Sequence, residues 1–75
     1  MGIQTKTTTE LIKIATAGAG FTLDASNKTT TDLIKIAAAA STSGAQVTFS
    51  GLKNKTTTEL IKIGVAGKGC VVIED

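Results

Sequence analysis

The chain has 75 residues, a net charge of +2, two aromatic residues, and basic residues that are all lysine. Nucleic-acid interfaces need concentrated charge, arginine forks or stacking rings, and a membrane span needs about 20 consecutive apolar residues, so we expect neither partner. Histidine is absent and Cys70 is the only cysteine, so the composition predicts no enzyme, no cofactor, no metal site and, by default, a cytoplasmic location.

One nine-residue phrase, Lys-Thr-Thr-Thr-acid-Leu-Ile-Lys-Ile, begins at Lys6, Lys28 and Lys55. Repetition at a period of 20 to 50 residues indicates one supersecondary unit used several times. We therefore predict a single domain over 1–75, with tandem repeats at about 6–27, 28–54 and 55–75. Such similar copies arise by recent duplication or by consensus design, and the sequence leaves both origins open.

Every copy of the phrase predicts the start of a helix. Its first threonine is a helix N-cap, and the acid three residues later completes a capping box. Leucine and isoleucine follow at helical spacing, and glycine ends each helix. The middle copy has four extra residues before the next strand, which predicts one more helical turn, through the alanine run and ending near 41–43.

Short β-type runs flank the predicted helices, at residues 2–5, 21–25, 46–51 and 70–74. The resulting order is β-α-β-α-β-α-β. Since crossovers between parallel strands are right-handed, strands that neighbour each other in sequence and in space would put all helices on one face. The predicted fold is α/β and solenoid-like, with a parallel four-stranded sheet in the order 1-2-3-4.

These units resemble the leucine-rich-repeat class in their period and in their alternation of strand and helix. The strand signature of that family, Leu-x-x-Leu-x-Leu-x-x-Asn, is partly matched by residues 21–27, where the asparagine falls one place late. In residues 47–54 it falls two places late, and the last strand has none. The resemblance implies a repeat scaffold with a binding role, and it transfers no site residue.

Two rows of strand residues are expected to face away from the helices when the strands are aligned from the helix-ending glycines. The early strands contribute polar residues to this open face, which form a candidate binding surface for another protein: Thr22, Asp24, Thr48 and Ser50. The last strand contributes Val71 and Ile73. Exposed apolar residues on a strand with a free edge favour association, so the predicted oligomer interface comprises Val71 and Ile73, with Cys70 and Val72 beside them.

The three helix starts should lie side by side along one rim. Helix N-termini attract anions, so a phosphate-type site is an alternative, formed by Lys6, Thr7, Lys28, Thr29, Lys55 and Thr56. Simple capping with solvated lysines is the plainer interpretation. The sequence thus predicts a non-enzymatic repeat scaffold for self-assembly, as a dimer or an open stack, or for binding another protein.

Overall fold

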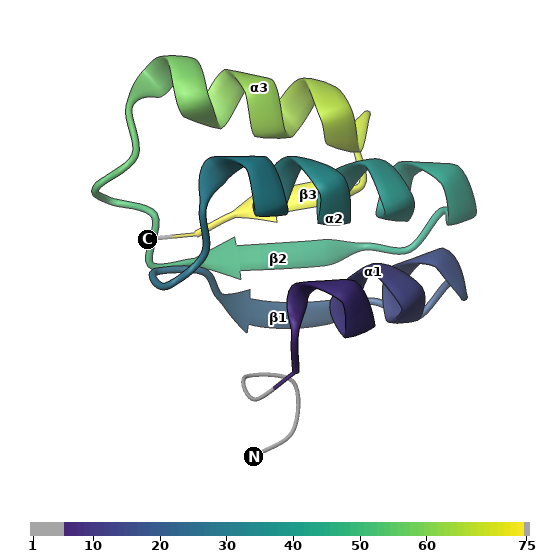
Figure 1. Ribbon diagram of the computed structural model, residues 1–75. Helices are drawn as coiled ribbons and strands as arrows, with labels where there is room; N and C mark the ends of the chain where they lie inside the picture. Colours follow the sequence, from purple (N-terminus) through teal and green to yellow (C-terminus); the bar gives the residue numbers. More distant parts are fainter. Residues whose placement is uncertain (1–5, 75) are drawn as a thin grey trace.

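The computed structural model describes residues 6–74, so the strand predicted at 2–5 lies outside the described residues. Helix and strand alternate along the chain, and the strands form a parallel sheet in the order β1-β2-β3. The three helices lie side by side over one face of that sheet, with α2 between α1 and α3 (Figure 1). The elements are α1 (Thr8–Thr16), β1 (Phe21–Asp24), α2 (Thr30–Ser43), β2 (Val47–Ser50), α3 (Thr57–Gly67) and β3 (Val71–Ile73).

The predicted helix starts are confirmed. Thr7, Thr29 and Thr56 are the N-caps, and each hydroxyl accepts a hydrogen bond from the backbone N–H three residues later. In α1 and α3 the glutamate accepts a bond from the cap N–H, which completes the predicted capping box. In α2 Asp32 makes no such bond to Thr29, so the box predicted there is not formed. The extra turn of the middle helix is also confirmed, because α2 spans 14 residues and ends at Ser43 before the left-handed Gly44.

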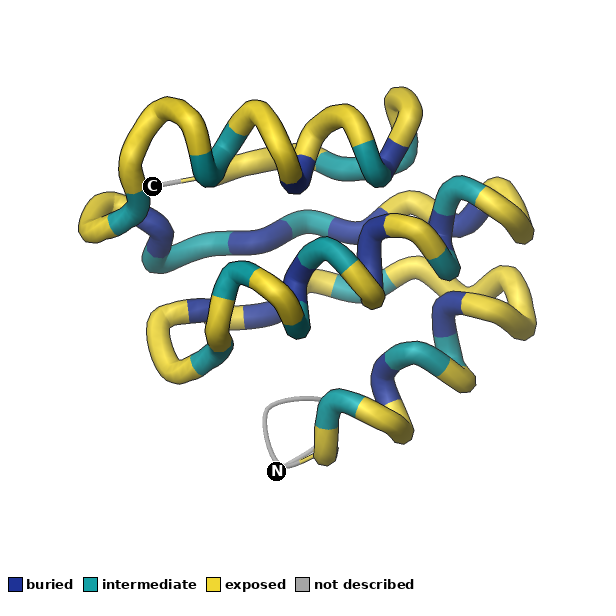
Figure 2. The backbone as a smooth tube through the Cα atoms, turned by 45° about the horizontal axis from the view of Figure 1, so that its top comes forward, coloured by how far each residue is buried: buried dark blue, intermediate teal, exposed yellow. Residues whose placement is uncertain are grey.

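The core lies between the helices and the sheet, as the buried segments in Figure 2 show. Phe49 is the largest fully buried side chain and lies on the central strand. Around it, the leucines of the first two repeats and the second isoleucines of the last two repeats are buried with a helical period, and Leu60 is partly buried against them. The fully buried large residues are Phe49, Leu11, Leu23, Leu33, Ile36, Ile63 and Val47.

The register of the last strand differs from the prediction by one residue. Phe21 aligns with Val47 and Val47 with Val71, so Val71 and Ile73 belong to the helix-facing rows, whereas Val72 joins the open face. The prediction that placed Val71 and Ile73 on the open face was therefore wrong. Its physical cause is the length of the last helix: α1 ends ten residues after Lys6, but α3 ends twelve residues after Lys55.

Candidate association surface

Each helix has two side faces, defined here by three positions each. The forward face, which looks toward the next repeat, carries the second threonine, the first isoleucine and the residue three places after that isoleucine. The backward face, which looks toward the preceding repeat, carries the first lysine of the phrase, its acidic residue and its second isoleucine. The forward faces are Thr8, Ile12 and Ala15, then Thr30, Ile34 and Ala37, then Thr57, Ile61 and Gly64; the backward faces are Lys6, Glu10 and Ile14, then Lys28, Asp32 and Ile36, then Lys55, Glu59 and Ile63.

Burial follows these faces closely. The forward-face isoleucines Ile12 and Ile34 are half-buried against the core, whereas Ile61 is 59% exposed. The third forward position follows the same rule, since Ala15 and Ala37 are buried and Gly64 is exposed. The forward face is therefore covered in the first two repeats and uncovered in the third.

The backward face shows the opposite trend. Ile36 and Ile63 are fully buried, whereas Ile14 of the first repeat is only half-buried. Ile14 lines an open depression on the outer side of α1, together with Lys6, Glu10 and Lys13. The two ends of the described fold therefore expose the two different halves of one repeated contact.

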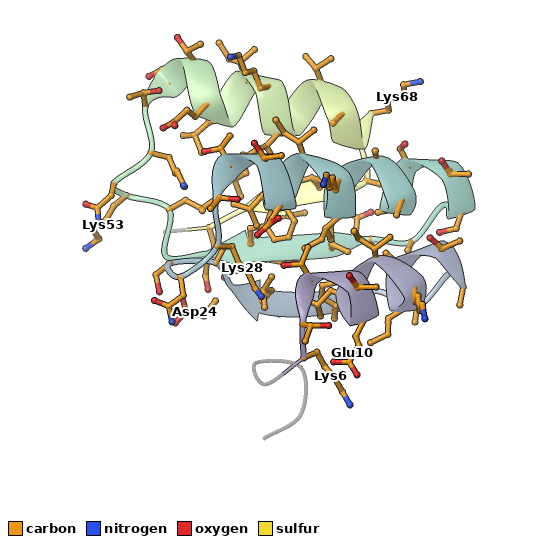
Figure 3. The ribbon with its side chains drawn as sticks, in the orientation of Figure 1. Lys6, Glu10, Asp24, Lys28, Lys53 and Lys68 are labelled. Atoms are coloured by element: carbon orange, nitrogen blue, oxygen red, sulfur yellow. The ribbon has the colours of Figure 1, made fainter. Side chains whose placement is uncertain are left out.

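Hydrogen bonds at the helix starts join forward to backward faces. Lys28 Nζ donates to Thr8 Oγ1 at 3.4 Å, and Thr30 Oγ1 donates to Glu59 Oε2 at 3.2 Å. Lys55 Nζ reaches the carbonyl oxygen of Lys28 at 3.3 Å. Figure 3 shows Lys28 directed toward the start of α1, while Lys6 and Glu10 lie on the side of α1 away from α2. The α1–α2 junction thus adds a lysine-threonine bond to its apolar contact, and the α2–α3 junction adds a lysine-carbonyl bond and a threonine-glutamate bond.

The predicted oligomer residues of β3 lie at the same end as the forward face of the third repeat. Val71 is half-buried and packs against α3 where the helix ends at Gly67. Val72 and Ile73 are each 41% exposed. Cys70 is half-buried, and its carbonyl oxygen accepts the N–H of Val47. Exposed apolar area at this end therefore comes from Val72, Ile73 and the adjoining helix.

The predicted open-face residues lie on the sheet surface opposite the helices, where Thr22 aligns with Thr48 and Asp24 with Ser50. Asp24 Oδ1 accepts the N–H of Ser26, and this bond lowers the pKa of the Asp24 carboxyl. Ser50 Oγ donates to the carbonyl oxygen of Leu23. These bonds hold two of the four side chains against nearby backbone, one on a neighbouring strand and one two residues along the chain.

The predicted anion-binding corners already hold carboxylates. Glu10 accepts from the N–H of Thr7 and Glu59 from the N–H of Thr56, and these backbone bonds are the main reason that both glutamates have a lowered pKa. Two lysines of the set bond to neighbouring repeats, as described above. An added anion would therefore compete with an internal one at α1 and α3.

Sequence reasoning missed the forward face as a surface. Ile61 has the same helical spacing as Ile12 and Ile34, so the pattern within one helix gives no sign that it is exposed, whereas the alignment of the repeats does. A position that is apolar in every copy has no partner where the described structure holds no following helix. The exposure of Ile61 follows from that rule.

Within residues 6–74, no helix is long and apolar enough to cross a membrane, and no three His, Cys, Asp or Glu side chains gather as a metal site would require. No protein-family model, curated protein or solved structure matches the chain. Function therefore has to be argued from the geometry alone.

Proposed function

We propose that the protein is a non-enzymatic repeat scaffold whose activity is self-association, in a solenoid-like arrangement that resembles the leucine-rich-repeat class. The surface is the exposed end of the third repeat, formed by the forward face of α3 and the adjoining β3. One observation carries the proposal: Ile61 is 59% exposed, although both of its counterparts in earlier repeats are covered by the next helix.

Exposed apolar side chains at this end are concentrated. Among the described residues, the large hydrophobic side chains with substantial exposure are Ile61, Val65, Val72 and Ile73, and all belong to α3 or β3. Val65 lies outside the forward face, at a helix position that is exposed in all three repeats, so the association surface rests on Ile61, Val72 and Ile73. Each β3 pairing described is with β2, so the other edge of β3 has no strand beside it in the described part of the chain. Apolar surface next to a free strand edge favours association. Repeat arrays need polar outer faces to remain apart, whereas the described third-repeat end exposes Ile61, Val72 and Ile73.

The alternatives have less support. Anion binding at the helix starts would have to displace Glu10 and Glu59 from the backbone N–H groups of Thr7 and Thr56. The open sheet face offers another protein a polar surface, and two of its side chains are bound to nearby backbone. Neither surface gains an exposed apolar anchor of the kind that dominates protein interfaces, apart from Val72.

The mass in solution tests the proposal. Light scattering on samples from about 10 µM to 1 mM should give a mass that rises above 7.6 kDa with concentration, because contacts of this small size are weak. Ile61→Lys should lower the association by at least about tenfold, since it places a charge in the contact. A mass of 7.6 kDa at every concentration would rule the proposal out.

Val65→Lys is the matched control. It introduces the same charge on the same helix, at a side chain that is 69% exposed. The equivalent residues Thr16 and Ala38 remain exposed although their repeats have a following neighbour. We therefore expect Val65→Lys to leave the mass close to that of the unmodified chain. Equal loss in both variants would mean that charge, and not the forward face, controls association.

A further inference from the structure

We infer that the occupant of the exposed third-repeat end is the first repeat of a second copy of this chain, docked head to tail. The inference rests on the proposed function and adds the partner surface and the symmetry. The forward face of α3 in one copy would receive the backward face of α1 in the next. The contact would repeat the junctions that already join α1 to α2 and α2 to α3 within one chain.

The apolar halves of the two ends are complementary. Within the chain, Ile12 and Ile34 on the forward side accompany the fully buried Ile36 and Ile63 on the backward side of the following helix. In the described structure, Ile61 has no following repeat to pack against, and the half-buried Ile14 has no preceding one. Gly64 has nothing near its missing side chain, which leaves room for a helix at close range.

The polar halves are complementary as well. At the α1–α2 junction Lys28 reaches Thr8, and at the α2–α3 junction Lys55 reaches the Lys28 carbonyl while Thr30 donates to Glu59. Within the described residues, the equivalent groups at the two ends make no bond to another repeat. These groups are Thr57 and the Lys55 carbonyl at one end, and Lys6 and Glu10 at the other. In the head-to-tail contact, Lys6 would bond to the Thr57 corner and Thr57 would donate to Glu10.

Symmetry separates this contact from a dimer of like ends. A two-fold dimer through the third repeat would place Ile61 beside Ile61 and would pair the β3 strands antiparallel. The head-to-tail contact keeps the parallel sense of the sheet, and because it joins two different surfaces it leaves one of each unused at the ends. Such a contact grows an open stack and does not stop at two copies.

Complementation of two blocked variants tests the inference. Ile61→Lys blocks the forward end and leaves the backward end intact, whereas Ile14→Lys blocks the backward end and leaves the forward end intact. In the head-to-tail contact each variant alone is monomeric, because its one usable end finds no usable partner. Mixed in equal amounts, the two should form a 1:1 heterodimer of finite size, since both outer ends of the pair are blocked.

Light scattering on a mixture in which one variant carries a mass tag distinguishes the outcomes, because it measures the mass of the complex that forms. A tagged-untagged pair with the mass of two chains, absent from either variant alone, is the expected result. A stable dimer of Ile14→Lys alone would overturn the inference in favour of the two-fold arrangement, while leaving self-association in place. Absence of a heterodimer when the unmodified chain associates would also overturn it. A monomeric unmodified chain would remove the proposed function and this inference together.

Ile14 is half-buried, so its variant needs a check on folding. Far-ultraviolet circular dichroism should match the unmodified chain at low concentration. A second blocked head, Lys6→Glu, changes an exposed residue outside the capping box of α1 and reverses the charge expected to meet Thr57 and the Lys55 carbonyl. The same heterodimer must form with this variant, and failure with both heads would contradict the assigned surface.

Discussion

Two glycines of α3 show how single residues report on the packing of a repeat. A Cβ added at Gly64 would meet nothing within 4 Å, and its counterparts in the other repeats are Ala15 and Ala37. A Cβ added at Gly67 would collide with the side chain of Val71. One glycine is therefore required by contact with β3, while the other costs helix stability without a local packing reason.

Substituting these glycines by alanine should change stability in opposite directions. We expect Gly64→Ala to raise the free energy of unfolding by about 1 kcal/mol, through higher helix propensity. Gly67→Ala should lower it by about 1 to 3 kcal/mol, because overpacking forces Val71 to shift. Urea denaturation in an Ile61→Lys background, where association is suppressed, measures both. Stabilisation by Gly67→Ala would contradict the close packing of α3 on β3.

At the scale of the element, the helices were predictable and the last strand was not. The Thr-x-x-acid spacing fixed the N-caps at Thr7, Thr29 and Thr56 because capping depends only on neighbouring residues. Strand register depends on how far the preceding helix runs. Here α3 continues to Gly67 and is followed by two left-handed residues, Lys68 with φ 48° and Gly69 with φ 89°. The end of α3 at Gly67 is packed against Val71, and the local sequence alone does not predict this contact.

The polar open face was predictable for a similar reason, since Thr22, Asp24, Thr48 and Ser50 alternate with Leu23 and Phe49. The association surface was not. Ile61 belongs to a stripe with the same spacing in every repeat, and its exposure depends on the absence of a following helix in the described structure. A sequence pattern shows which apolar side chains lie on a packing face of the helix, but only the three-dimensional structure shows which of them are covered.

The capping boxes should make stability depend on pH. The pKa of Glu59 is lowered from 4.5, first by the N–H of Thr56 and then by the hydroxyl of Thr30. A carboxyl with a lowered folded pKa stabilises the fold above its unfolded pKa, and this contribution is lost as the pH falls through the folded value. We expect Glu59→Gln to lower the denaturation midpoint near neutral pH. The difference between its midpoint and that of the unmodified chain should become smaller as the pH falls below 4.5.

Thr30→Val provides the control for that prediction. The hydroxyl of Thr30 contacts Glu59 across the α2–α3 junction but does not contact Glu10, which has its own capping box. Carboxyl titration by NMR should show a higher pKa for Glu59 in this variant and an unchanged pKa for Glu10. Equal shifts at both glutamates would mean that the Thr30 bond is not specific to the junction.

At the scale of the whole molecule, stability in a linear array depends on the number of neighbours of each repeat. Helix α2 packs against both α1 and α3, whereas each outer helix has one helical neighbour in the described structure. The central strand β2 is likewise paired on both edges. Local opening should therefore begin at the outer helices, and association should act on those same helices, because it supplies their missing neighbours.

Amide hydrogen exchange tests this distribution. In Ile61→Lys, which we expect to be monomeric, exchange should be slowest in α2 and β2 and faster in α1 and α3. In the unmodified chain, raising the concentration should slow exchange in both α1 and α3 and change α2 little. The reason is that each head-to-tail contact covers α3 of one copy and α1 of the next. Slowing confined to α3 and β3 would instead indicate a two-fold contact between third repeats. Slowing of the open-face strand residues alone would move the association surface to the sheet.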